Sequence, residues 1–192
     1  QEFGDELYLL EEHASDGHVD LAGDNFSGEI ISTNDLLQEI HSDESKIIDE
    51  TAYIKARLFD MLIGDWDRHQ DQWRWSEFEK DGNIIYKPIP RDRDQAFAKP
   101  DGNLTSLLLN IPGARHITHF KATYPSEKWF NFSAHSLDIA FIKKATFEDW
   151  KKQTNWIISQ LSDEAIDEAF AKLPTRRYNN FVFPPMLNPS IL

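Results

Sequence analysis

The sequence predicts a mainly α protein with one small β-hairpin, an α+β fold in a single domain that spans residues 1–192. Helical patterns with matching capping residues recur along the chain. One pair of strand-like segments flanks the dipeptide Asp81-Gly82, which is a turn signal. No internal repeat, low-complexity tract or domain boundary interrupts the chain, and 192 residues are enough to bury one core.

The first part of the chain is predicted to form a strand, a loop and a short helix. Residues 6–13 begin as an apolar run of strand length. Residues 14–29 are polar and punctuated by glycine, which is typical of a loop. Residues 32–45 are predicted to form a short helix, with Ser32 or Thr33 as its cap.

A stronger helix is predicted for residues 49–64, because apolar residues recur there at three- and four-residue spacing. Asp49 and Glu50 suit the start of a helix, and Gly64 suits its end. The apolar positions are Ile54, Leu58, Met61 and Leu62.

Residues 73–89 are predicted to form the hairpin, which separates two acidic loops. The first acidic loop is residues 65–72 and the second is residues 91–97. Because a tight hairpin returns the chain to the place where it left, we expect the two loops to be neighbours in space.

Two further helices are predicted after a region, residues 115–133, that carries only a weak signal. In residues 146–161, Thr146 and Asp149 have the spacing of a capping box. Residues 162–173 form the second, capped by Ser162. The apolar face of the first comprises Phe147, Trp150, Ile157 and Leu161. The six tryptophans are expected to pack in the core and hairpin, with Trp66 as an anchor in or under the first acidic loop.

Composition excludes several classes of function. Hydrophobic residues make up 40% of the chain, and no apolar run approaches the roughly 20 residues of a membrane span. The net charge of −13 repels phosphate backbones and anionic membranes, so neither nucleic acid nor direct membrane insertion is expected. Because there is no cysteine, disulfides, thiolate catalysis and cysteine zinc sites are excluded. The chain starts at Gln1 rather than Met, so we expect a piece or a processed product of a longer protein.

The two acidic loops have the side chains of a site for Mg²⁺ or Mn²⁺ and phosphate. Hard cations take oxygen ligands, usually one or two carboxylates with waters and phosphate oxygens. A carboxylate that binds no metal could orient a hydroxyl or a water and accept its proton. Arginines could neutralise phosphate oxygens, and the candidates are Arg68, Arg91 and Arg93. The polar candidates are Asp65, Asp67, His69, Asp71 and Gln72 in the first loop and Asp92 and Asp94 in the second.

A purely structural interpretation of the same residues stays open. Asp67 and Asp92 would then cap the turn and form surface ion pairs. Gln72 would hold the entrance of the hairpin, His69 would anchor loop backbone, and Arg93 would be an ion-pair partner.

The string DWDRHQDQW, followed after the hairpin by IPRDRDQAF, resembles the catalytic core of atypical members of the protein-kinase-like superfamily. These members are the HipA-type kinases, the secretory kinases, the type II phosphatidylinositol 4-kinases and the CotH-type kinases. They have a catalytic aspartate, a polar metal ligand five residues on, a hairpin, and then a metal-binding aspartate followed by phenylalanine. Residues 1–13 resemble the hinge-like strand that joins the two kinase lobes, and the later helices fit a helical C-terminal lobe.

The resemblance implies phosphoryl transfer from ATP, with Mg²⁺ or Mn²⁺, to an unidentified acceptor. Asp67 takes the catalytic position, Gln72 the amide position and Asp92 the second metal position. Together with the charge argument, this gives as catalytic residues Asp67, Arg68 and His69, as metal ligands Gln72, Asp92 and Asp94, and as a nucleotide-binding residue Arg93.

The motifs depart from the family pattern in three ways. The amide ligand is Gln rather than Asn, the catalytic motif has the order Asp-Arg-His rather than His-Arg-Asp, and no G-x-G-x-x-G is present. An N-terminal lobe would therefore have to come from flanking parts of the parent protein. The motif is also similar to segments of bacterial envelope proteins that carry a calcineurin-like metallophosphoesterase domain, which implies an envelope or periplasmic location, although composition does not exclude the cytoplasm.

Three hypotheses of function follow. The first is a metal-dependent, kinase-like phosphotransferase module. The second is a metal-dependent phosphoesterase or its accessory domain. The third is a non-catalytic binding or scaffold domain that keeps kinase-like loops as structure.

Overall fold

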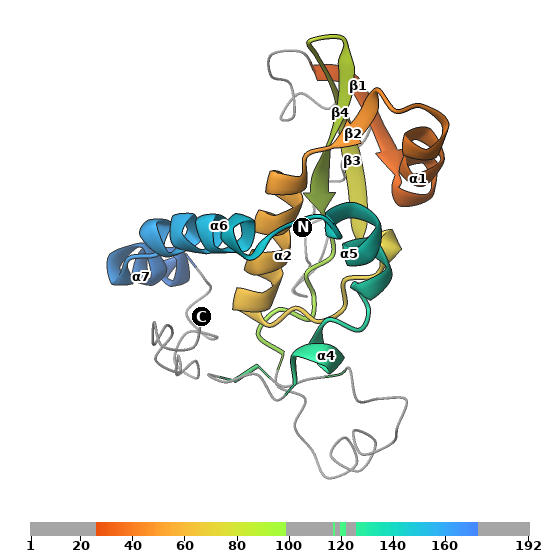
Figure 1. Cartoon of the computed structure of the whole chain (residues 1–192). Coiled ribbons are helices and arrows are strands. Elements are labelled where there is room, and N and C mark those ends of the chain that lie inside the picture. Colours follow the sequence, from red (N-terminus) through yellow and green to blue (C-terminus); the bar gives the residue numbers. More distant parts are fainter. Residues whose placement is uncertain (1–25, 99–116, 118–119, 122–125, 173–192) are drawn as a thin grey trace, which may run out of the picture.

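The computed structural model describes residues 26–98, 117, 120–121 and 126–172 (Figure 1). A four-stranded mixed sheet has the strand order β1-β3-β4-β2. Its strands are β1 Phe26–Ser32, β2 Lys46–Ile48, β3 Trp73–Lys80 and β4 Asn83–Pro90. β1 and β4 are both antiparallel to β3, whereas β2 is parallel to β4.

The predicted fold class is wrong, because the hairpin is the centre of a larger sheet and the fold is α+β rather than mainly α. β1 includes residues 26–29, which the glycine punctuation assigned to a loop. Gly28 has φ 87° and lies where the register with β3 shifts, so a bulge absorbs the glycine within the strand. β2 has only three residues, too few for a periodic pattern to appear.

The hairpin itself is confirmed. β3 and β4 pair from Trp73 opposite Pro90 to Lys80 opposite Asn83, so the turn consists of Asp81 and Gly82 alone. Both turn residues have positive φ, 53° and 79°. This is the backbone that two-residue hairpins prefer, and Asp-Gly supplies it at low cost.

The two helices before the first acidic loop also follow the sequence. α1 spans Thr33–Ser42, and the hydroxyl of its cap, Ser32, accepts a hydrogen bond from a backbone N–H of the first turn. α2 spans Glu50–Ile63 and is capped by Asp49. It ends at Gly64, which has the left-handed backbone (φ 74°) that a helix end commonly needs.

The core lies between α2, the sheet and α5, which spans His135–Ile142. Its centre is aromatic: the Tyr53 ring lies 5.1 Å from Trp73, 5.9 Å from Trp75 and 5.4 Å from Phe141, centroid to centroid. Trp73 and Trp75 are fully buried, as expected for hairpin tryptophans, whereas the Trp156 side chain is 49% exposed.

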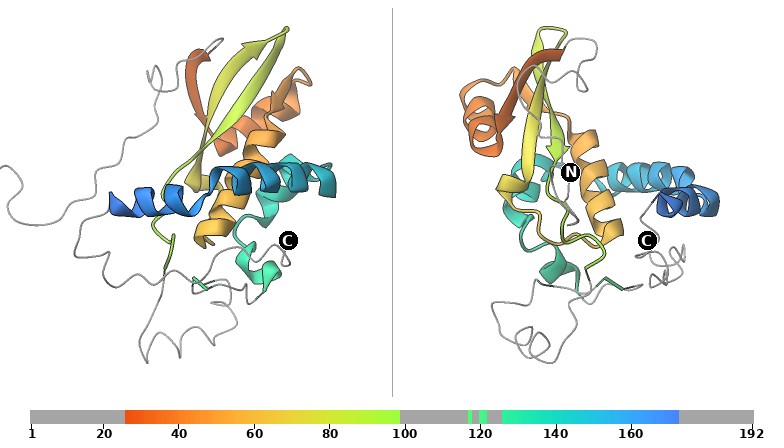
Figure 2. Two further views of the ribbon diagram at one scale, coloured as in Figure 1. Left: turned by 90° about the vertical axis from the view of Figure 1, so that its left-hand side faces the viewer. Right: turned by 180° about the vertical axis from the view of Figure 1, so that it is seen from behind.

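The described C-terminal helices are α4 Glu127–Phe130, α5, α6 Phe147–Gln160 and α7 Asp163–Ala171. The predicted capping box at the start of α6 is present, with Thr146 and Asp149 bonded reciprocally. α6 packs on α2, and α6 and α7 extend away from the sheet (Figures 1 and 2). The predicted apolar face is only partly used, because Phe147 is 73% exposed. The hinge-like strand predicted for residues 1–13 lies outside the described residues. In the described part, no helix is long and apolar enough to cross a membrane.

Replacing Gly64 with alanine should destabilise the protein more than the same change at Gly82. Both glycines have left-handed backbone, which costs an L-residue roughly 1–2 kcal/mol. A Cβ at Gly64 would also lie 2.6 Å from the Phe120 ring, whereas a Cβ at Gly82 would meet no atom of the described residues within 4 Å. We expect losses of about 2 and about 1 kcal/mol respectively, measured by urea unfolding. Equal losses would contradict the contact with Phe120.

Candidate functional site

The structure brings the two acidic loops together, as the hairpin argument expected. The backbone N–H of Arg91 donates to the carbonyl of Gln72 at 2.9 Å, directly beyond the last pair of the hairpin. The first loop leaves α2 at Gly64 and ends in a short 3₁₀ turn, Gln70–Gln72, before β3 starts. The site therefore lies where α2 and the open end of the hairpin meet.

Gln72 links the two loops through its side chain. Its Nε2 lies 3.2 Å from Oδ2 of Asp92 and 3.4 Å from Nε2 of His69. His69 in turn lies 3.9 Å from Oδ2 of Asp67. Three of the predicted site residues of the first loop and one of the second thus form a continuous chain of neighbours.

The members of this chain differ in exposure. Gln72 is buried, whereas Asp92 is exposed and the side chains of Asp67 and His69 are 31% and 43% exposed. Asp92 also has a left-handed backbone, φ 49°, which is uncommon outside glycine and is tolerated best by Asn and Asp. The fifth aspartate of the two loops, Asp94, is exposed. The linked residues thus present the carboxylates of Asp67 and Asp92 and the imidazole of His69 to solvent, above the buried amide of Gln72.

Arg68 lies beneath these contacting side chains and joins the two loops from the interior of the protein. It is fully buried, and its guanidinium donates to the carbonyls of Gln72 at 3.1 Å and Arg91 at 2.7 Å. The same group pairs with Asp60 at 3.1 Å and with Asp65 at 3.3 Å. An arginine can do this because its planar fork carries five N–H donors.

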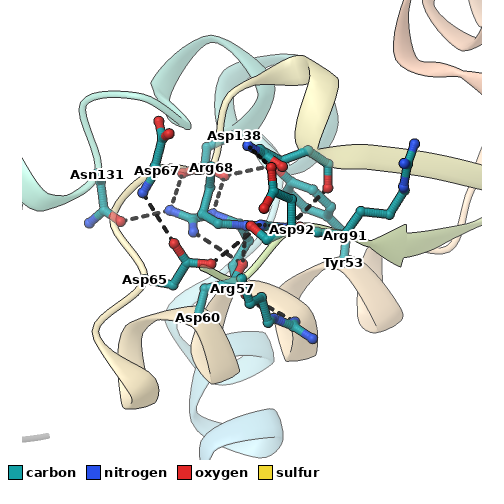
Figure 3. Close-up of polar contacts among 12 residues, drawn as sticks. Tyr53, Arg57, Asp60, Asp65, Asp67, Arg68, Arg91, Asp92, Asn131 and Asp138 are labelled. Atoms are coloured by element: carbon teal, nitrogen blue, oxygen red, sulfur yellow. Dashed lines mark hydrogen bonds and ion pairs between the residues drawn. The ribbon is translucent and has the colours of Figure 1, made fainter. Parts of the chain in front are cut away.

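Asp60, on α2, is the centre of the buried network (Figure 3). It is fully buried and accepts ion pairs from three arginines, of which Arg68 and Arg93 come from the two acidic loops. The third is Arg57, one helical turn before it, at 3.6 Å. One carboxylate therefore fixes α2, the first loop and the second loop to one another.

Arg57 extends the network to α5 and to the turn before it. Its Nε donates to Asp138 at 3.0 Å, and its Nη2 donates to the side-chain oxygen of Asn131 at 2.7 Å. The Tyr53 hydroxyl also donates to the carboxylate of Asp138, at 3.0 Å. The site is thereby anchored to the aromatic core rather than to the surface.

Burial dominates the electrostatics of these groups. It raises the pKa of Asp65 to about 6, although Arg68 opposes the shift. Burial likewise lowers the pKa of Arg68 and raises that of Tyr53 well above its ordinary value. Burial alone would lower the pKa of Arg57, but Asp138, Tyr53 and Asp60 together outweigh burial and the pKa is raised.

Sequence reasoning missed Asp60, Arg57 and Asp138. A signal for the first two was present: they share the buried face of α2 with Tyr53, at spacings of three and four residues, in a helix whose other residues on that face are apolar. Two opposite charges three residues apart on a buried face indicate an internal ion pair. Nothing local marks Asp138, because its partners are more than 80 residues away.

Any magnesium ion held in these loops would need phosphate and water oxygens beside its protein ligands. Among the described residues, no three acidic or imidazole side chains converge as metal ligands. Asp92 and Gln72 supply one carboxylate and one amide in contact, and Mg²⁺ in nucleotide-binding sites usually takes only one or two carboxylates from the protein. These two residues would hold the ion.

Family models, curated proteins and solved structures contain no match to this chain. The kinase-like resemblance therefore stays a prediction that rests on the sequence motifs.

The raised pKa of Asp65 predicts a stability that falls as pH rises from about 4 to about 6. Between its ordinary pKa of 3.8 and its folded value of about 6, Asp65 is protonated when folded and ionised when unfolded. Unfolding then releases a proton, so a higher pH favours the unfolded chain. The free energy of unfolding of the native protein, minus that of Asp65→Asn, should fall across this window in urea titrations. A difference that rises instead would mean that the pairing with Arg68 outweighs burial.

Proposed function

We propose that this chain is the catalytic-lobe module of a metal-dependent, kinase-like phosphotransferase that moves a phosphoryl group from a nucleotide to an unidentified acceptor. The observation that carries the proposal is the contact between Gln72 and Asp92 across two loops that Arg68 clamps together. At this junction Asp92 also holds an exposed carboxylate on left-handed backbone. Such strain is concentrated at functional sites.

Asp92 and Gln72 would hold Mg²⁺, which neutralises charge on the phosphoryl oxygens. Asp67 lies in the same chain of contacts, half-exposed and next to His69. It would orient the acceptor hydroxyl and accept its proton, the role that a carboxylate outside the metal shell performs in phosphoryl transfer.

Of the arginines, we assign Arg93 to contact with phosphate. Its side chain is 29% exposed, and two of its nitrogens are already fixed on Asp60, which orients the guanidinium. Arg68 has no exposed surface, so we assign it to positioning the loops rather than to binding substrate. An N-terminal lobe, supplied by flanking parts of the parent protein, would cover the nucleotide, and we propose the bacterial envelope as the location.

The test is phosphoryl transfer by the longer parent protein, which would supply the N-terminal lobe, from ATP labelled on the γ-phosphate, with Mg²⁺ or Mn²⁺. Metal-dependent transfer or release of the label should fall by about 100-fold or more in Asp67→Asn and Asp92→Asn, as expected for a lost base or metal ligand. Glu79→Gln removes one exposed carboxylate on β3 and should change nothing. Hydrolysis of p-nitrophenyl phosphate without any turnover of ATP would instead favour the phosphoesterase hypothesis. Activity in neither assay would favour the scaffold hypothesis.

A further inference from the structure

The backbone fixes which nitrogen of His69 carries the proton. The N–H of Asp71 donates to Nδ1 of His69 at 3.3 Å, in the capping position of the 3₁₀ turn. A backbone N–H can only donate, so Nδ1 must offer its lone pair. The neutral ring then holds its hydrogen on Nε2, which becomes a donor.

The donor at Nε2 faces the side-chain amide of Gln72. The nearest atom of that amide lies 3.4 Å away, whereas the carboxylates of Asp67 and Asp71 lie 3.9 Å and 3.8 Å from the ring nitrogens, beyond hydrogen-bonding distance. The best partner for Nε2–H is the amide oxygen. With the amide nitrogen in that place, two N–H donors would face each other and no hydrogen bond could form.

The same amide atom also lies 3.2 Å from Oδ2 of Asp92. A nitrogen there satisfies Asp92 and conflicts with His69, whereas an oxygen satisfies His69 and repels Asp92. A half-turn of the amide exchanges the two atoms. A cation held by Gln72 and Asp92 would remove the repulsion, because it would lie between two negatively polarised oxygens.

We propose that His69 is a positioning residue that turns the amide oxygen of Gln72 toward the metal ion. The inference rests on the proposed metal site and adds an orienting partner to it. Without the ion, the Gln72 amide nitrogen donates to Asp92. If the ion were bound, the amide would turn over and its oxygen would accept from Nε2–H of His69. Hydrogen bonds of this kind fix the orientation of metal ligands, and their loss typically costs 10–100-fold in affinity.

A double-mutant cycle on Mn²⁺ affinity tests the proposal, with the full chain at pH 8 and calorimetry as the readout. His69→Ala should weaken Mn²⁺ binding by about 10-fold or more when residue 72 is Gln. In the Gln72→Glu background both terminal atoms are oxygens and need no orienting, so His69→Ala should change the affinity by less than about 3-fold. An equal loss in both backgrounds would overturn the proposal, because His69 would then act on the ion directly or on the fold.

An independent readout separates this inference from the proposed function. The ¹⁵N shifts of the His69 ring, recorded without metal, should report the Nε2–H form. The Nδ1–H form would overturn the orienting role and leave the metal site standing. An Nε2–H ring in a chain that binds no Mn²⁺ would overturn the metal site, and the orienting role with it.

Discussion

Asp60→Ala will lower the free energy of unfolding by about 3–5 kcal/mol, the largest effect that we expect from any single substitution in this site. The Asp60 carboxylate is fully buried and pairs with Arg57, Arg68 and Arg93. Removing it leaves positive charge in the interior with too little compensation. The cost of an unpaired buried charge exceeds the benefit that the pair itself contributes.

Urea unfolding of Asp60→Ala beside Asp71→Ala measures this effect. The side chain of Asp71 is 76% exposed, so the control makes the same chemical change outside the network and should stay within about 0.5 kcal/mol of the native protein. A loss at Asp60 as small as that at Asp71 would contradict the central role of Asp60.

Arg68→Met will have the second large effect, on stability and on metal binding together. The change keeps much of the volume but removes the donors that hold the carbonyls of Gln72 and Arg91, and it leaves Asp65 buried without its cation. We expect a loss of about 3 kcal/mol or more. Because Asp92 follows directly on Arg91, the contact between Asp92 and Gln72 should loosen and Mn²⁺ affinity should fall as well.

Arg74→Met is the matched control, six positions along the chain. Within the described residues, Arg74 bonds two neighbouring carbonyls, those of Asp71 and Trp73, and it lies on β3 beside the site. In Arg74→Met the free energy of unfolding should be little changed and the Mn²⁺ affinity should be unaffected. If Arg68→Met kept native Mn²⁺ affinity in the folded protein, Arg68 would not be positioning the loops.

Elements with local chemical signals could be predicted from the sequence. Capping residues mark the start of α1, α2, α6 and α7, and Asp81-Gly82 specifies the hairpin turn. These signals depend on hydrogen bonds within a few residues of each other, so no knowledge of the rest of the fold is needed.

The rest of the sheet depends on partners far along the chain. β1 pairs with residues 74–78 and β2 with residues 84–86, and neither strand is long or regular enough to be recognised alone. Because neither was predicted as a strand, the four-stranded sheet was predicted as a lone hairpin. That is why the fold class was wrong although the hairpin was right.

The candidate site was predictable in its outer layer only. The acidic motifs identified Asp67, His69, Gln72 and Asp92, and hairpin geometry brought the loops together. The buried ion pairs with the loops could not be predicted. Asp60 has the sequence context of an ordinary helix residue, and its partners Arg68 and Arg93 come from the two loops. The sequence also left Arg68 as a phosphate-binding candidate, and only its complete burial shows that it holds the loops.

Titration of the chain with Mn²⁺ in a calorimeter, with and without ATP, tests the central claim most directly. Asparagine tolerates the left-handed backbone of Asp92, so Asp92→Asn removes the charge without adding strain. The account predicts binding by the native chain, loss of that binding in Asp92→Asn, and retention in Asp67→Asn, whose carboxylate lies outside the metal shell. No heat with the native chain, or equal binding with Asp92→Asn, would contradict a metal site at these two loops.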